Sequence, residues 1–135
     1  MAYFITNYFK TVKFKLPAFF TFSYLFFFGF AVNASVPFIK NGSFDFCPGV
    51  TINEMVNSYI ANPRWDYFKA TDGKYYVNVE GQIYYYEQLV DMLLQFRIYN
   101  SSDRFEVNAF EIQGEPQYEY MTDALLENMC NEVYY

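Results

Sequence analysis

Residues 74–114 alternate between apolar and polar side chains with a period of two, and this pattern predicts three consecutive β-strands. In the first strand Val77, Val79 and Ile83 fall on one face, while polar residues and tyrosines fall on the other. Residues 89–99 alternate in the same way. A sheet with one apolar face is typical of antiparallel strands that bury a single side.

The third strand changes phase part-way along its length. Phe105 and Val107 lie on one apolar phase, whereas Phe110 and Ile112 lie on the other. One extra residue in one strand of a ladder produces such a shift, so we expect a β-bulge near Ala109.

An additional strand is predicted at Trp65–Thr71, because Asp72 and Gly73 form a strong signal for a two-residue type I′ hairpin turn. Tyr86–Gln88 gives a weaker turn signal between the next two strands. Gly114–Pro116 is expected to end the sheet, because proline cannot donate a ladder hydrogen bond.

Two helices with one apolar stripe each flank the strands. Thr51 and Glu54 have the spacing of a capping box, which predicts a helix start, and Pro63 is expected to end that helix. The second helix is expected over residues 117–131, with Tyr118 beside its apolar stripe.

The order of these elements is a helix, a four-stranded antiparallel β-meander and a second helix. Since both helices are one-sided, the order predicts a two-layer α+β domain in which both cover the apolar face of the sheet. We assign residues 47–135 to this single domain. Residues 35–46 show little periodicity and are interpreted as a connecting segment.

Residues 1–34 have the layout of an export signal. Three lysines are followed by an uncharged apolar run, with a cleavage site predicted after Ala34. The alternative is an uncleaved signal anchor, because the 19 residues 16–34 are long enough to span a hydrocarbon core of about 30 Å. In both cases an apolar helix precedes an exported domain, and contact with the membrane is expected only through residues 16–34 if they are retained.

Charge is distributed unevenly along the chain. Residues 35–135 contain six basic and fifteen acidic residues, which gives this part a net charge of about −9. No basic residue follows Arg104, whereas seven acidic residues do. Because phosphate binding depends on Lys and Arg, nucleic acid is not expected as a partner. The sequence has no nucleotide or calcium-binding motif, and no cofactor is expected.

Cys47 immediately precedes the first helix, and Cys130 lies near the end of the second. Two cysteines in an exported chain favour a single disulfide bond. A redox pair would have Cys-x-x-Cys spacing, and the chain has no histidine for a zinc site. We therefore expect a structural bridge that brings the start of the first helix close to the end of the second.

The absence of histidine removes Ser-His-Asp and Cys-His catalysis and leaves carboxylate chemistry. Glu80 and Glu111 are the acids of greatest interest, since two carboxylates in a tyrosine-lined cleft would suit glycoside hydrolysis. Acids that alternate with apolar residues are also ordinary surface positions of half-exposed strands. We predict no catalytic residue.

Tyrosine is concentrated on the strand face opposite the predicted core, and tyrosine is favoured at contact surfaces. The alternative is that these rings stack across strands and stabilise the sheet. The candidate binding face consists of Tyr76, Tyr84, Tyr86 and Tyr99, with Leu93 and Phe110 as further candidates.

Several short motifs follow the leader: CPGVT at 47–51, VNVEG at 77–81, FEVNAFEI at 105–112 and LLENMC at 125–130. Over about residues 46–132, the pattern resembles a group of small extracytoplasmic bacterial domains that follow a signal peptide or a single membrane anchor, sometimes with a cytoplasmic zinc ribbon. The resemblance implies a secreted or simply anchored domain without a zinc ribbon, and implies no activity. The layout is also similar, at the level of fold alone, to envelope-assembly lipoproteins and β-lactamase inhibitor proteins.

These observations predict an exported, non-catalytic binding or envelope-assembly domain whose partner is an envelope or secreted protein. One alternative is a carboxylate-dependent glycan hydrolase that uses Glu80 and Glu111. Another is a secreted inhibitor that presents Asn100–Arg104 to a hydrolase.

Overall fold

The structure is a computed structural model that describes residues 35–99 and 104–134. One of its named helices precedes the strands, and the other follows them. In chain order they are α3 (Ile52–Tyr59), β1 (Ala61–Lys69), β2 (Tyr75–Tyr85), β3 (Gln88–Tyr99), β4 (Arg104–Ile112), β5 (Glu115–Pro116) and α4 (Glu119–Tyr134). The predicted leader and the predicted polar loop at residues 100–103 lie outside the described residues. No helix within the described ranges is long and apolar enough to cross a membrane.

The predicted α+β class is confirmed, with antiparallel strands in the order β1-β2-β3-β4-β5 and helices at both ends. The expectation of four strands is wrong by one, because Gln113 and Gly114 form a tight turn and the chain then adds the two-residue strand β5. Pro116 is tolerated there because β5 is an edge strand, where a missing N–H breaks no interior ladder.

The β-bulge expected near Ala109 is confirmed. Phe96 pairs with Val107 and Gln95 pairs with Ala109, so Asn108 is the extra residue of β4. The bulge shifts the alternation of side chains by one residue, so that Phe110 lies in the main core. Phe110 is therefore wrongly placed among the candidates for the outer face.

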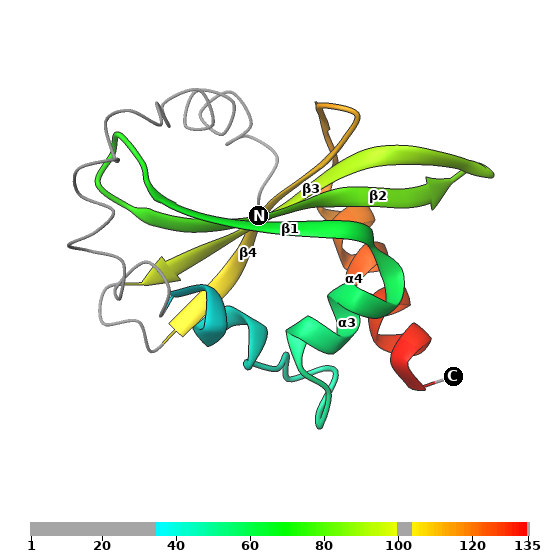
Figure 1. The fold of residues 1–135 in the computed structure, drawn as a ribbon, viewed down its shortest axis with the longest axis horizontal. Helices are drawn as coiled ribbons and strands as arrows, with labels where there is room; N and C mark the ends of the chain where they lie inside the picture. Colours follow the sequence, from blue (N-terminus) through cyan, green and yellow to red (C-terminus); the bar gives the residue numbers. More distant parts are fainter. Residues whose placement is uncertain (1–34, 100–103, 135) are drawn as a thin grey trace.

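The main core lies between the sheet and the helix layer, and α3 and α4 lie on the same side of the sheet (Figure 1). Residues 35–46 were expected to be a connecting segment, but residues 35–40 are helical and Ile39 is completely buried in this core. The ring of Phe44 stacks 6.4 Å from that of Phe96. The segment therefore belongs to the folded domain, because its apolar side chains complete the core.

The capping box at the start of α3 is confirmed. The hydroxyl of Thr51 accepts the Glu54 N–H at 3.1 Å, and the Glu54 carboxylate accepts the Thr51 N–H at 2.8 Å. The chain turns directly after the helix, so β1 begins at Ala61 rather than at Trp65. Gly81 of β2 faces this turn, where a Cβ atom would lie 2.5 Å from Ile60 Cγ2. Gly81 thus permits a close approach of two backbone segments.

The disulfide bond between Cys47 and Cys130 is present, with Cα atoms 6.0 Å apart. It joins the turn before α3 to the last part of α4, as expected. The Tyr134 hydroxyl strengthens the same junction by donating to the Pro48 carbonyl at 2.7 Å. Met55 of α3 and Met129 of α4 are both buried in the main core, which confirms that the helices share one face of the sheet.

The structure differs from the strong turn prediction at Asp72 and Gly73 and places the tightest turn at the weaker one. Asp72 and Gly73 belong to a three-residue loop in which Gly73 donates to the Ala70 carbonyl and only Gly73 has positive φ, so a two-residue type I′ turn is wrong there. The two-residue turn lies instead at Tyr86 and Glu87, which have φ values of 51° and 64°. Positive φ at both central positions is what the twist of a tight hairpin requires.

Candidate functional site

The face of the sheet opposite the helices carries a buried ladder of side-chain amides. Gln95 Nε2 donates to Asn78 Oδ1 at 3.1 Å, and Asn108 Nδ2 donates to Gln95 Oε1 at 2.6 Å. The bulge brings Asn108 into this row. Hydrogen bonds between the amides therefore link β2, β3 and β4 on the face that the alternation pattern identifies only as polar.

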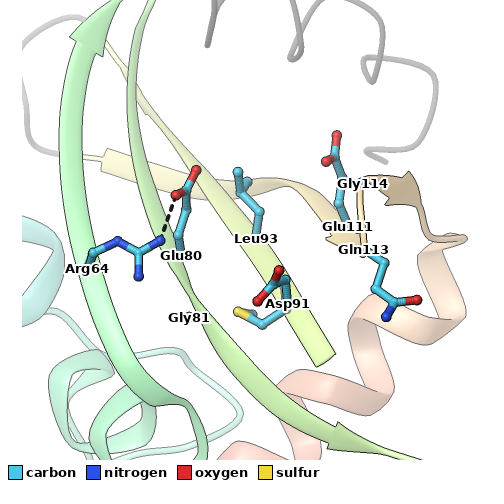
Figure 2. A pocket seen from close by; sticks show the side chains of 9 residues that line it. Arg64, Glu80, Gly81, Asp91, Leu93, Glu111, Gln113 and Gly114 are labelled. Atoms are coloured by element: carbon cyan, nitrogen blue, oxygen red, sulfur yellow. Dashed lines mark hydrogen bonds and ion pairs between the residues drawn. The ribbon is translucent and has the colours of Figure 1, made fainter. Parts of the chain in front are cut away.

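A hollow of about 510 Å³ lies on the same face, and it brings together the two glutamates singled out in the sequence (Figure 2). Glu80 and Glu111 both pair with Leu93 of the intervening strand. Figure 2 shows Leu93 between the two carboxylates, with Asp91 beside them. Arg64 Nη2 lies 3.1 Å from Glu80 Oε1 and neutralises one side of the hollow.

The geometry of the hollow limits its chemistry. Two strand spacings place the backbones of Glu80 and Glu111 about 10 Å apart, wider than the carboxyl separation of about 5–5.5 Å in retaining glycosidases. Both side chains project away from the sheet without converging (Figure 2). No group of three or more His, Cys, Asp or Glu residues in the described ranges is placed to bind a metal ion.

The four tyrosines of the candidate binding face do not lie together. Tyr76 is only 2% exposed, and its ring stacks 5.7 Å from that of Phe68. Tyr84 and Tyr86 are 75% and 84% exposed at the tip of the β2–β3 hairpin. Tyr99 lies at the opposite end of β3 and is partly buried. The outer face therefore separates into a buried cluster, an exposed tip and a distinct Tyr99 environment.

Tyr99 is held by charged side chains of the same chain. The guanidinium groups of Arg97 and Arg104 lie 4.2 Å and 4.5 Å from the centre of its ring. Its hydroxyl donates to Glu106 Oε2 at 2.5 Å. This hydrogen bond, and next the partial burial of the ring, raise the pKa of Tyr99. The cluster satisfies both the ring face and the phenol within the chain.

A second set of rings, not recognised from the sequence, lies at the start of α4. Tyr118 and Tyr120 are 64% and 67% exposed, and their rings stack 5.9 Å apart. Tyr118 was expected beside an apolar helix stripe, but α4 begins at Glu119 and the Tyr118 carbonyl accepts the Met121 N–H at 2.9 Å. Tyr118 therefore precedes the helix and its ring remains outside the core.

The hairpin carries a further pair of rings. The rings of Tyr85 and Tyr86 lie 4.6 Å apart. Partial burial raises the pKa of Tyr85, the neighbouring Tyr86 raises it further, and the Tyr120 phenol adds a smaller increase. We call the two pairs, Tyr85 with Tyr86 and Tyr118 with Tyr120, the tyrosine surface.

The charge around the tyrosine surface is entirely negative in the sequence. Residues 75–96 and 105–134 contain no Lys or Arg, while Glu87 and Glu119 belong to the turn and the helix start themselves. The six basic residues of the described ranges are all engaged with aromatic rings or carboxylates elsewhere. These contacts are Lys40 over Trp65, Lys69 over Tyr75, Arg97 and Arg104 over Tyr99, Arg64 with Glu80, and Lys74 with Asp72.

Comparisons with known proteins place no constraint on this site. No protein-family model matches the chain, and neither the curated proteins nor the solved structures contain a significant match.

Proposed function

We propose that this chain is an exported, non-catalytic binding domain that contacts an envelope or secreted protein through the tyrosine surface. The exposed rings at the hairpin tip and helix start provide large, rigid contact area with polar ends, a composition enriched at protein interfaces. The disulfide bond supports residence in an oxidising, extracytoplasmic compartment.

The backbone of the hairpin turn is the observation that carries this proposal. Tyr86 and Glu87 both adopt positive φ, a conformation that disfavours residues with a Cβ by roughly 1–2 kcal/mol each and favours Asn-Gly. A bulky ring and a charge at these positions reduce stability without adding burial, because Tyr86 is almost fully exposed. Residues in such a conformation cluster at functional sites, which supports contact between this turn and another molecule.

Site-specific photocrosslinking in the native envelope tests the proposal. Tyr86 is replaced by the photoreactive amino acid benzoylphenylalanine, which keeps an aromatic ring at the tip. We expect a discrete crosslinked product from this position. The matched control is the same replacement at Tyr134, an exposed tyrosine at the far end of α4. Tyr134 lies about 20 Å from Tyr120 along the helix axis. Equal crosslinking from both positions, or none from Tyr86, would contradict the proposal.

The hollow on the outer face favours one second candidate, a carboxylate-dependent glycan hydrolase. Glu80 and Glu111 line it, and the spacing of about 10 Å between their backbones is closer to the carboxyl separation of inverting than of retaining enzymes. Glu80→Gln and Glu111→Gln should each abolish glycan cleavage, whereas the exposed control Glu115→Gln should not. Unchanged cleavage in both variants, or no cleavage by the unaltered protein, excludes this candidate.

A further inference from the structure

A groove of about 390 Å³ lies along α4 beside the disulfide bond. It shares no residue with the tyrosine surface or with the hollow on the outer face of the sheet. Its apolar part consists of Phe46, Leu126 and Cys130, and Phe46 is 52% exposed. A concave site with an apolar lining and a few polar groups is the usual form of a binding site.

The walls of this groove are held in place on both sides. Phe46 immediately precedes Cys47, whose disulfide bond to Cys130 joins this wall to α4. The centre of the Phe46 ring lies 5.1 Å from that of Phe44, and Phe44 stacks in turn on Phe96 of the main core. A surface that is ordered before contact loses little conformational entropy on binding. The half-exposed Phe46 ring is therefore a preorganised part of the groove.

Asp123 and Glu127 form the charged rim of the groove. They lie four residues apart on α4, so their side chains are neighbours on the helix surface, where like charges repel each other. Neither carboxylate forms an ion pair with another of the described residues. No basic residue follows Arg104 in the sequence. A cation from another molecule would offset this repulsion without displacing a partner within the domain.

We infer that the groove docks a segment of a partner protein in which a bulky apolar side chain is flanked by lysine or arginine. The apolar side chain occupies the space beside Phe46. The basic side chain lays its aliphatic stem along the apolar lining and brings its charge to Asp123 and Glu127. The inference goes beyond the proposed function, because it assigns a second interaction surface with its own partner chemistry.

The charge of the groove favours this occupant over two others. A symmetric dimer through the groove would bring the Asp123 and Glu127 carboxylates of two copies together, and residues 35–135 already carry a net charge of about −9. A fatty acid or an anionic lipid would place its headgroup beside the same carboxylates. The basic segment gains from both the apolar lining and the acidic rim.

Peptide selection tests the inference. The oxidised full-length chain is held in nanodiscs of phosphatidylcholine, a lipid without net charge, and is offered a phage library of random twelve-residue peptides from which binders of empty nanodiscs have been removed. We expect the selected peptides to share a bulky apolar residue beside lysine or arginine. In the strongest synthetic peptide, replacing lysine by acetyl-lysine, or arginine by citrulline, should weaken binding about tenfold in a fluorescence anisotropy assay.

Substitutions in the protein then locate the binding site. Asp123→Asn combined with Glu127→Gln removes two charges that repel each other, so this variant should fold at least as well as the unaltered protein and bind the selected peptide about tenfold more weakly. The matched control is Glu115→Gln combined with Glu132→Gln, which changes the net charge equally at exposed acids outside the groove. Phe46→Ser removes the apolar wall and should also weaken binding about tenfold.

The remaining outcomes reject the inference. These are equal binding by the groove variant and its control, selection of acidic or uncharged peptides, and no enrichment of any peptide. Dimerisation that is lost in Phe46→Ser, without peptide binding, would assign the groove to a second copy of the chain. The crosslinking test of the proposed function remains independent, because neither Tyr86 nor Tyr134 lines the groove. A crosslink from Tyr86 without selected peptides would reject the groove alone, and the reverse result would reject the tyrosine surface alone.

Discussion

The two ends of β3 present the same residue type in opposite circumstances. Tyr99 ends the strand beside two arginines and a glutamate, whereas Tyr86 precedes it in an exposed turn next to Glu87. The strand separates these ends by about 36 Å. A tyrosine whose ring and phenol are satisfied by its own chain stabilises the fold. A tyrosine at positive φ with an exposed ring gives the fold no comparable support.

Removing the disulfide bond should have the largest effect and tests whether both ends belong to one cooperative unit. Cys47→Ser opens a loop with a sequence separation of 83. The chain-entropy model predicts a loss of about 4–5 kcal/mol, which lowers the Tm by about 15–30 °C for a domain of this size. Thermal unfolding followed at Tyr86 and Tyr99 should give one shared transition. Cys47→Ser combined with Cys130→Ser should match the single variant, and separate transitions at the two ends would contradict this expectation.

Truncating the rings should then show that the two ends of β3 differ in their contribution to the free energy of unfolding. Tyr99→Ala removes two cation–π contacts and a charge-assisted hydrogen bond, so we expect a loss of about 2 kcal/mol. Tyr86→Ala and Tyr120→Ala should change the free energy of unfolding by less than about 0.5 kcal/mol. Urea unfolding measures all three, and a comparable loss at both ends would remove the distinction between them.

Replacing the turn residues should increase the stability of the domain, whereas truncating Tyr99 should lower it. Tyr86→Asn combined with Glu87→Gly relieves two unfavourable φ values and should stabilise the domain by about 1–2 kcal/mol. Tyr84→Asn lies in regular strand and should give no gain. A turn variant that is less stable than the unaltered protein would show that Tyr86 contributes to the fold.

Alkaline pH should produce the smallest difference. The folded-state pKa of Tyr99 is raised, chiefly by its hydrogen bond to Glu106, so the folded state holds the phenolic proton more tightly than the unfolded chain. Its contribution to stability is therefore fully present below the unfolded pKa of about 10 and is lost as pH rises from there through the folded pKa. Urea unfolding between pH 8 and 11 should show a shallower alkaline decline in Tyr99→Phe. An identical decline would indicate that other tyrosines determine it.

Much of the framework could be predicted from the sequence because local chemistry determines it. Thr51 and Glu54 form their capping box within one helical turn, and the phase change after Val107 reports the bulge directly. The disulfide bond could be predicted because two cysteines allow a single pairing within the chain. Such features depend on short spacings or on a single possible pairing.

The candidate site was harder to predict because it depends on which segments meet. Alternation places Tyr76 and Tyr84 on one face, but it does not reveal that Tyr76 stacks on Phe68 and is buried. It also gives no reason to single out Tyr120, whose ring is exposed near the start of α4. The turn at Tyr86 was only a weak prediction, since the side chains found there are unusual for positive φ. Tyr86, which belongs to the tyrosine surface, is one of the residues that depart from local backbone preference.

The order of the strands has a consequence for how the domain forms. Each strand pairs with its neighbour in the sequence, so the sheet can grow by successive local hairpins as the chain emerges. Cys130 follows every one of these strands, whereas Cys47 precedes them all. We therefore expect the thiols to remain separate until the meander has formed and α4 has docked, so that oxidation locks a fold already assembled and does not guide its assembly.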